Sequence, residues 1–119
     1  MALPDHYGYF KRTEGYDGDH VDCYVGPNTD STKAFVVDQV DATTGKFDEH
    51  KVMLGYSSEA DARAAYRKAF SDGKADDRIG SVTPVSVGYL KEWLMSGDTM
   101  KPMGRKRYAT GGAVTGHVG

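Results

Sequence analysis

Hydrophobic residues form three short runs in the first half of the chain. Residues 21–26 and 34–40 are rich in β-branched and aromatic side chains and are bounded by turn residues, so both predict strands. A third apolar run, residues 52–54, follows a turn centred on Gly45. Consecutive strands joined by short turns favour an antiparallel meander.

Further along, apolar residues recur with the period of an α-helix. The positions that repeat at i, i+3, i+4, i+7 and i+8 are Ala62, Ala65, Tyr66, Ala69 and Phe70. Ser58 begins a near capping box, so the pattern predicts an amphipathic helix over residues 58–71. Ser86 can cap a second helix that ends near Gly97. The apolar face of that helix carries Leu90, Trp93 and Leu94.

Residues 98–119 have no apolar period. They are rich in glycine, and their basic residues are Lys101, Arg105, Lys106 and Arg107. We expect a tail that stays mobile unless a partner orders it. A chain of 119 residues suits one domain. We therefore predict an α+β domain over residues 1–97, a β-meander with two flanking helices, followed by a basic tail over residues 98–119.

Composition excludes several classes of protein. The chain has 15 Lys+Arg against 17 Asp+Glu, so no bulk positive field draws it to nucleic acid or to an acidic membrane. No apolar run approaches the roughly 18 residues of a membrane span, and the start lacks a signal pattern. Cys23 is the only cysteine, so neither an internal disulfide nor a paired-cysteine metal site can form. We expect a cytoplasmic protein without a membrane partner.

The acidity is concentrated early in the chain. Residues 1–56 carry 10 Asp+Glu against 5 Lys+Arg, and Asp17, Asp19 and Asp22 fall within six residues of one another. Clustered carboxylates repel unless water, donors or a cation neutralise them, and oxygen ligands select hard cations such as Mg²⁺, Mn²⁺ or Ca²⁺. An EF-hand is excluded because Asp22 stands where that loop needs glycine. A solvated turn leading into a strand is the alternative interpretation.

A second acidic group lies in the following turn. Its carboxylates are Asp38, Asp41, Asp48 and Glu49, with His50 and Lys51 beside them. If the strands pair, this turn can approach the first group, and two divalent cations about 4 Å apart could clamp a phosphoryl group there. A hydrated hairpin loop is the alternative. Three roles fit His20 and His50: metal ligand, partner of a metal ligand, or hydrogen-bonded surface histidine. Cys23 and Trp93 fit the core, and Tyr24 fits the core or its rim.

Two motifs carry a resemblance to a known family. Asp17-Gly18-Asp19-His20-Val21-Asp22, with Tyr7-Gly8-Tyr9 ten residues upstream, resembles the signature of soluble (family I) inorganic pyrophosphatases. Over about residues 4–97 the chain looks like the pyrophosphatase-like domains of bacteriophage and mobile-element proteins. The resemblance implies a small OB-like β-barrel with flanking helices.

The resemblance also implies an activity and a set of site residues. The activity is Mg²⁺-dependent (or Mn²⁺-dependent) hydrolysis of pyrophosphate or a related phosphoanhydride by metal-activated water. Asp19 and Asp22 would be catalytic. The implied metal ligands are Asp17, Asp19, Asp22, Asp41 and Asp48, and the implied substrate-binding residues are Tyr7, Lys51, Tyr66 and Arg67.

A second function stays open because the enzyme family carries a Glu, a Lys and an Arg on strands upstream of the Tyr-Gly-Tyr motif, whereas this sequence begins six residues before it. The alternative is a non-catalytic, virion-associated phage protein that docks on a partner chain through residues 98–119. A homo-oligomer or partner could also supply the cations. An OB-type nucleic-acid binder is a weaker alternative, because residues 1–56 are acidic.

Overall fold

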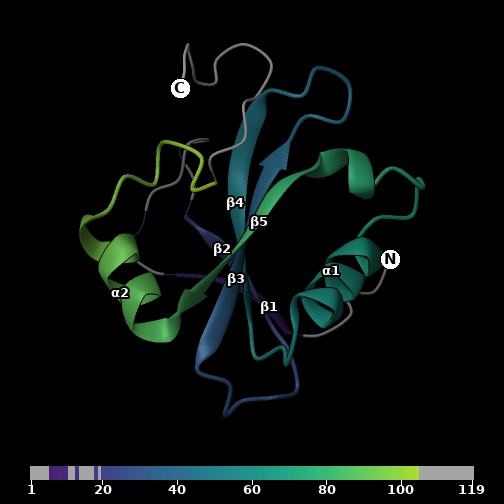
Figure 1. Ribbon diagram of the computed structural model, residues 1–119. Helices are drawn as coiled ribbons and strands as arrows, with labels where there is room; N and C mark the ends of the chain where they lie inside the picture. Colours follow the sequence, from purple (N-terminus) through teal and green to yellow (C-terminus); the bar gives the residue numbers. More distant parts are fainter. Residues whose placement is uncertain (1–5, 11–12, 14–17, 19, 105–119) are drawn as a thin grey trace.

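The computed structural model describes residues 6–10, 13, 18 and 20–104. Figure 1 shows the described elements, a sheet with a helix on either side of it. In chain order they are β1 (His6–Tyr9), β2 (Asp22–Val25), β3 (Lys33–Val40), β4 (Phe47–Leu54), α1 (Glu59–Lys68), the 3₁₀ turn η1 (Asp76–Arg78), β5 (Ile79–Ser86) and α2 (Val87–Ser96). The predicted α+β class with two flanking helices is confirmed.

The described strands form one mixed sheet in the order β1-β2-β4-β3-β5. β3 pairs antiparallel with both β4 and β5, and β1 pairs antiparallel with β2. β2 pairs with β4 in the parallel sense, with Asp22 opposite Lys51. The chain therefore crosses over between β2 and β4 instead of running as a simple meander. This crossover places the first acidic strand beside the lysine of β4.

Both helices begin at the serines that the sequence indicates. Ser58 caps α1 by accepting a hydrogen bond from the backbone N–H of Asp61 at 3.1 Å. Ser86 caps α2 in the same way, through the N–H of Tyr89 at 3.0 Å, and α2 ends at the C-cap Gly97. Both helix starts and the end of α2 were predictable because capping depends on neighbouring residues only. Helix α1 ends at Lys68, three residues before the predicted end at residue 71.

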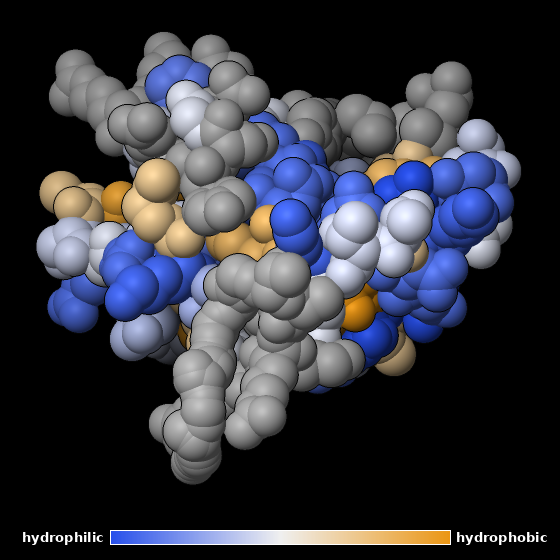
Figure 2. Space-filling view, turned by 90° about the horizontal axis from the view of Figure 1, so that it is seen from above, coloured by the Kyte–Doolittle hydropathy of each residue, from blue (hydrophilic) through white to orange (hydrophobic). Residues whose placement is uncertain are grey.

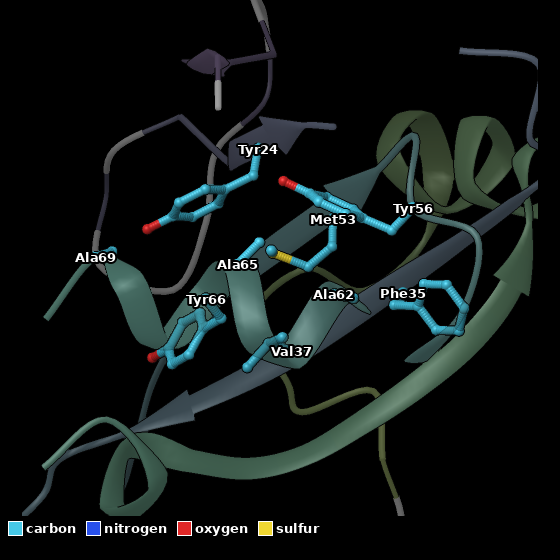
Figure 3. Close-up of a cluster of buried hydrophobic side chains, with 9 residues drawn as sticks. All are labelled: Tyr24, Phe35, Val37, Met53, Tyr56, Ala62, Ala65, Tyr66 and Ala69. Carbon is cyan, nitrogen blue, oxygen red and sulfur yellow. The ribbon is translucent and has the colours of Figure 1, made fainter. Parts of the chain in front are cut away.

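The face of the sheet covered by α1 holds the first of two hydrophobic clusters. Figure 3 shows side chains from the strands packed against residues of α1. The buried members are Tyr24, Phe35, Val37, Met53, Tyr56, Ala62, Ala65, Tyr66 and Ala69. The small alanines let α1 lie close to the sheet, and the apolar positions with helical period are those that pack.

The opposite face is covered by α2 and holds the second cluster. Its buried members are Val21, Cys23, Ala34, Val36, Val52, Leu90 and Trp93. Val36 and Val37 are neighbours on β3 but belong to different clusters, because successive strand residues point to opposite faces. The interpretation of Cys23, Tyr24 and Trp93 as core or rim residues is confirmed.

Residues 98–104, here called the C-terminal segment, pack against the α2 face. Asp38 is fully buried there and accepts hydrogen bonds from the N–H groups of Met103 at 3.0 Å and Gly104 at 2.7 Å. Ser81 donates its hydroxyl to the same carboxylate at 2.8 Å. A buried carboxylate needs such donors, which explains why this part of the predicted tail lies on the sheet. The packed structure thus extends through Gly104, and residues 105–119 lie outside the described part.

The surface of the described residues is mainly polar. Seen from above in Figure 2, hydrophilic side chains cover most of the described surface, and hydrophobic ones occur in small separate patches. Among the described residues, no helix has the length and hydrophobicity that crossing a membrane requires.

Candidate functional site

Lys51 is the centre of an acidic cluster on the α1 face of the sheet. Its ammonium group lies 2.8 Å from a carboxylate oxygen of Asp22 and 3.3 Å from one of Glu49. All three side chains are largely shielded from water, so these attractions are screened less than those of a surface ion pair. Asp22 and Lys51 are brought together by the parallel pairing of β2 with β4, which joins sequence positions 29 residues apart.

Glu49 is a site residue that the sequence interpretation did not choose. The sequence places it in the second acidic group, but the family resemblance implies Asp48 as the metal ligand there. Strand periodicity could have found it, because residues 49 and 51 must share a face when β4 is extended. The structure places Glu49 directly beside Lys51, opposite Gln39 of β3.

Asp48 also reaches this cluster, and it does so through an irregularity in the sheet. The pairing of β3 with β4 shifts between Gln39 and Val40, whose partners are Glu49 and Phe47. Asp48 lies between Phe47 and Glu49 and is the extra residue of a bulge. The usual alternation of side chains along a strand therefore does not force Asp48 onto the face opposite that of Glu49. The side-chain amide of Gln39 donates to Asp48 at 3.0 Å and to Glu49 at 3.2 Å.

Tyr66 lies at the edge of this network, inside the protein. Its side chain is buried, and its hydroxyl donates to the side-chain amide oxygen of Gln39, Oε1, at 2.6 Å. Burial, followed by the nearby Tyr24, raises the pKa of Tyr66 well above its usual value, so the phenol stays protonated at neutral pH. Tyr66 therefore joins the site as a support beneath the carboxylates.

Arg67 is held away from the cluster by a different partner. Its guanidinium lies 2.8 Å from Asp76 in η1, and both side chains are largely exposed. Asp41 stands at the hairpin between β3 and β4, where its carboxylate accepts from the N–H groups of Thr43 and Thr44, both at 2.8 Å. These donors lower the pKa of Asp41, and they show it organising the turn.

The signature loop between β1 and β2 is described only in part. Asp17 and Asp19 lie outside the described residues, and the side chain of Tyr7 is not described either. The ends of the loop are joined by Thr13, whose hydroxyl donates to the Phe10 carbonyl at 2.6 Å and accepts from the Val21 N–H at 3.0 Å. His20 is exposed and bonds to the Thr13 carbonyl at 2.9 Å, as expected for a hydrogen-bonded surface histidine.

His50 lies on the other face of the sheet. Its ring is buried, packs edge-on to Trp93 with centroids 4.8 Å apart, and has Nε2 3.3 Å from Asp38. Among the described residues, neither ring nitrogen has a hydrogen-bond partner of good geometry. Burial lowers the pKa of His50, and the Asp38 carboxylate opposes that effect. Because Asp38 and His50 belong to the α2 face, they are separated from Lys51 by the sheet.

The donor chemistry of the cluster fits a hard divalent cation. The cluster offers three carboxylates, those of Asp22, Glu49 and Asp48, and carboxylate oxygens are the ligands that Mg²⁺ and Mn²⁺ prefer. Their negative charge exceeds the positive charge of the Lys51 ammonium group. Within the described ranges, no three acidic, histidine or cysteine side chains converge closely enough to hold an ion together.

The fold and the cluster define a class: a small α+β protein whose mixed sheet carries a lysine-bridged acidic site on one face. A family model for inorganic pyrophosphatase matches residues 1–95, and the chain belongs to that family. No curated protein and no solved structure gives a significant match. The family match spans both helix-covered faces of the sheet, including the whole Lys51 cluster.

Proposed function

We propose that the protein hydrolyses pyrophosphate or a related phosphoanhydride in a Mg²⁺-dependent reaction. The observation that carries the proposal is the cluster of Asp22, Glu49 and Lys51 on one face of a fold that belongs to the inorganic pyrophosphatase family. Asp22 comes from the signature motif, and Lys51 comes from the second acidic group. Their contact supports the view that the two groups serve one site.

Each described residue has a distinct part in this proposal. Asp22, Glu49 and Asp48 would hold the cation, together with Asp17 and Asp19 of the signature loop. A bound divalent cation lowers the pKa of coordinated water and neutralises phosphate charge. Lys51 would bind a phosphate oxygen when substrate arrives, since its ammonium is the positive charge among these carboxylates. Tyr7 is a further proposed phosphate ligand.

Tyr66 and Arg67 have smaller roles in this proposal than the substrate binding that the family resemblance implies. The Tyr66 hydroxyl is buried and engaged with Gln39, and Arg67 is paired with Asp76. Substrate binding by Arg67 would require the exchange of that exposed pair for phosphate. Such an exchange costs little, because exposed ion pairs contribute at most about 1 kcal/mol.

Phosphate release from pyrophosphate tests the proposal directly. Wild-type protein with Mg²⁺ should release phosphate, and Asp19→Asn or Asp22→Asn should each lower kcat/KM by about 100-fold or more, the scale on which a preorganised charged group acts. Asp30→Asn is the matched control, because Asp30 is an exposed carboxylate in the turn before β3. It should keep the wild-type rate.

Two outcomes would contradict the proposal. Equal rates in wild type and Asp22→Asn would show that the cluster does no chemistry. No phosphate release by folded wild-type protein would favour the non-catalytic, partner-docking alternative.

A further inference from the structure

Gln39 connects helix α1 to the carboxylates of the candidate site. It is 7% exposed, and its amide makes three hydrogen bonds to side chains of other elements. The carbonyl oxygen accepts from Tyr66 at 2.6 Å, while the nitrogen donates to Asp48 at 3.0 Å and to Glu49 at 3.2 Å. Gln39 is therefore the junction between the α1 core and the acidic hairpin.

The chemistry of the partners fixes which way the amide points. Two carboxylates are acceptors and need the NH₂ group, whereas the Tyr66 phenol is protonated and can donate to the carbonyl oxygen. A flipped amide would place its oxygen against two anions and leave the phenol without an acceptor. All three bonds thus enforce one orientation, and the buried ring of Tyr66 holds it in place.

Gln39 also joins two carboxylates that a regular strand would place on opposite faces. Asp48 and Glu49 are consecutive, and in a regular strand consecutive side chains point to opposite faces. The shift in pairing at Gln39/Val40 releases Asp48 from that rule, and the amide then ties both carboxylates to one donor group. Because the amide is neutral, it brings the two anions together without cancelling their charge, unlike a lysine or arginine at that position.

We infer that Gln39 is a positioning residue of the candidate site, which holds the carboxylates of Asp48 and Glu49 on the same face of the sheet, where both could contribute to binding a divalent cation. The inference rests on the proposed function, because the role of the carboxylates as ligands comes from it. Gln39 touches neither substrate nor cation in this account. It acts through the two carboxylates, and Tyr66 acts through Gln39.

Mn²⁺ affinity without substrate separates this role from simple packing. Gln39→Met keeps the length of the side chain and removes all three hydrogen bonds, so it should weaken Mn²⁺ binding about tenfold, the lower end of the range for lost partners of metal ligands. The control is Val37→Ala, a buried position two residues earlier on the same face of β3. It should lower the melting temperature without changing the Mn²⁺ affinity.

Tyr66→Phe provides a second, milder variant should Gln39→Met fail to fold. It retains the buried ring and removes only the hydroxyl that orients the amide, so Mn²⁺ affinity should fall by a smaller factor. Calorimetric titration of each folded variant with Mn²⁺ alone supplies the affinities, and pyrophosphate kinetics should show a higher Mg²⁺ requirement in both.

The results distinguish failure of the inference from failure of the proposed function. If wild type binds Mn²⁺ and both Gln39→Met and Tyr66→Phe bind it as tightly as Val37→Ala does, the positioning role is wrong and the proposed function stands. If folded wild type binds no Mn²⁺ and releases no phosphate, the proposed function fails and the inference falls with it.

Discussion

Asp38 and Gln39 are adjacent on β3 but serve different faces of the sheet. Gln39 faces α1 and the acidic cluster, whereas Asp38 faces α2, where it meets His50 and the C-terminal segment. The sequence interpretation grouped Asp38, His50 and the hairpin carboxylates together because they are close along the chain. Strand periodicity separates them, and it could have been applied once β3 and β4 had been assigned.

His50 should make stability depend on pH. Burial lowers its pKa below the ordinary value of 6.5, against the opposing influence of Asp38, the Lys101 carbonyl and Asp98. Well above pH 6.5 the ring is neutral in both the folded and the unfolded chain. As the pH falls below 6.5, the unfolded chain takes up a proton that the folded protein still refuses, so the free energy of unfolding decreases until the folded pKa is passed.

Urea unfolding at pH 7.5, 6.5 and 5.5 measures this effect. Wild type should lose stability over that range, on a scale of about 1.4 kcal/mol for each unit by which the pKa is lowered. His50→Gln should be less stable at pH 7.5 and show a flatter dependence. His20→Gln alters an exposed ring and should retain the wild-type slope. An unchanged slope in His50→Gln would assign the effect to other groups.

At the scale of elements, local signals were predictable and distant pairings were not. Ser58 and Ser86 mark helix starts through bonds to residues three positions away. β5 was missed because Gly80 and Pro84 interrupt its apolar pattern, and it becomes a strand through pairing with β3. The parallel contact of β2 with β4 depends on a crossover, which no local pattern specifies.

The sequence predicts a tail where the C-terminal segment packs, for a related reason. Its sequence has no apolar period, yet Met103 packs against the α2-face cluster and its N–H bonds to Asp38. The segment is held by its N–H groups, which donate to the buried carboxylate of Asp38. A buried carboxylate needs such donors, but the burial of Asp38 follows from the position of β3 in the sheet. Asp38 was visible in the sequence, but its burial was not.

Gly104→Ala tests this attachment. A Cβ on Gly104 would overlap the Ser81 hydroxyl and come within 3.1 Å of an Asp38 carboxylate oxygen, so the backbone must move away from its acceptor. We expect a loss of about 1–3 kcal/mol in the free energy of unfolding, the usual range for overpacking and for a buried group that loses its partner. Thermal and urea unfolding measure this loss.

Gly88→Ala is the matched control for that substitution. Gly88 lies in α2, where an added Cβ meets only the Ser86 hydroxyl at 3.9 Å. Alanine should be neutral or stabilise the helix by up to about 1 kcal/mol. Equal stability of Gly104→Ala and wild type would mean that the segment does not depend on Asp38.

For the whole molecule, the acidic cluster predicts a link between divalent cations and stability. A cation that binds only the folded state stabilises it by about 2.7 kcal/mol at a hundredfold excess over Kd. Millimolar Mg²⁺ should therefore raise the melting temperature by several degrees relative to EDTA. Asp22→Asn should reduce this response and Asp30→Asn should retain it. Identical wild-type melting curves in Mg²⁺ and EDTA would argue against a folded cation site.

The attachment of Met103 and Gly104 to Asp38 also affects folding during synthesis. These contacts join positions 65 and 66 residues apart, so Asp38 leaves the ribosome long before its backbone donors exist. The described contacts of the α1 face, including the Lys51 cluster, involve residues up to Val82 in the sequence. The contacts of the α2 face also involve Trp93 and Met103, which are synthesised later. The nascent chain should therefore complete the face that bears the candidate site first, while the other face still exposes apolar surface to chaperones.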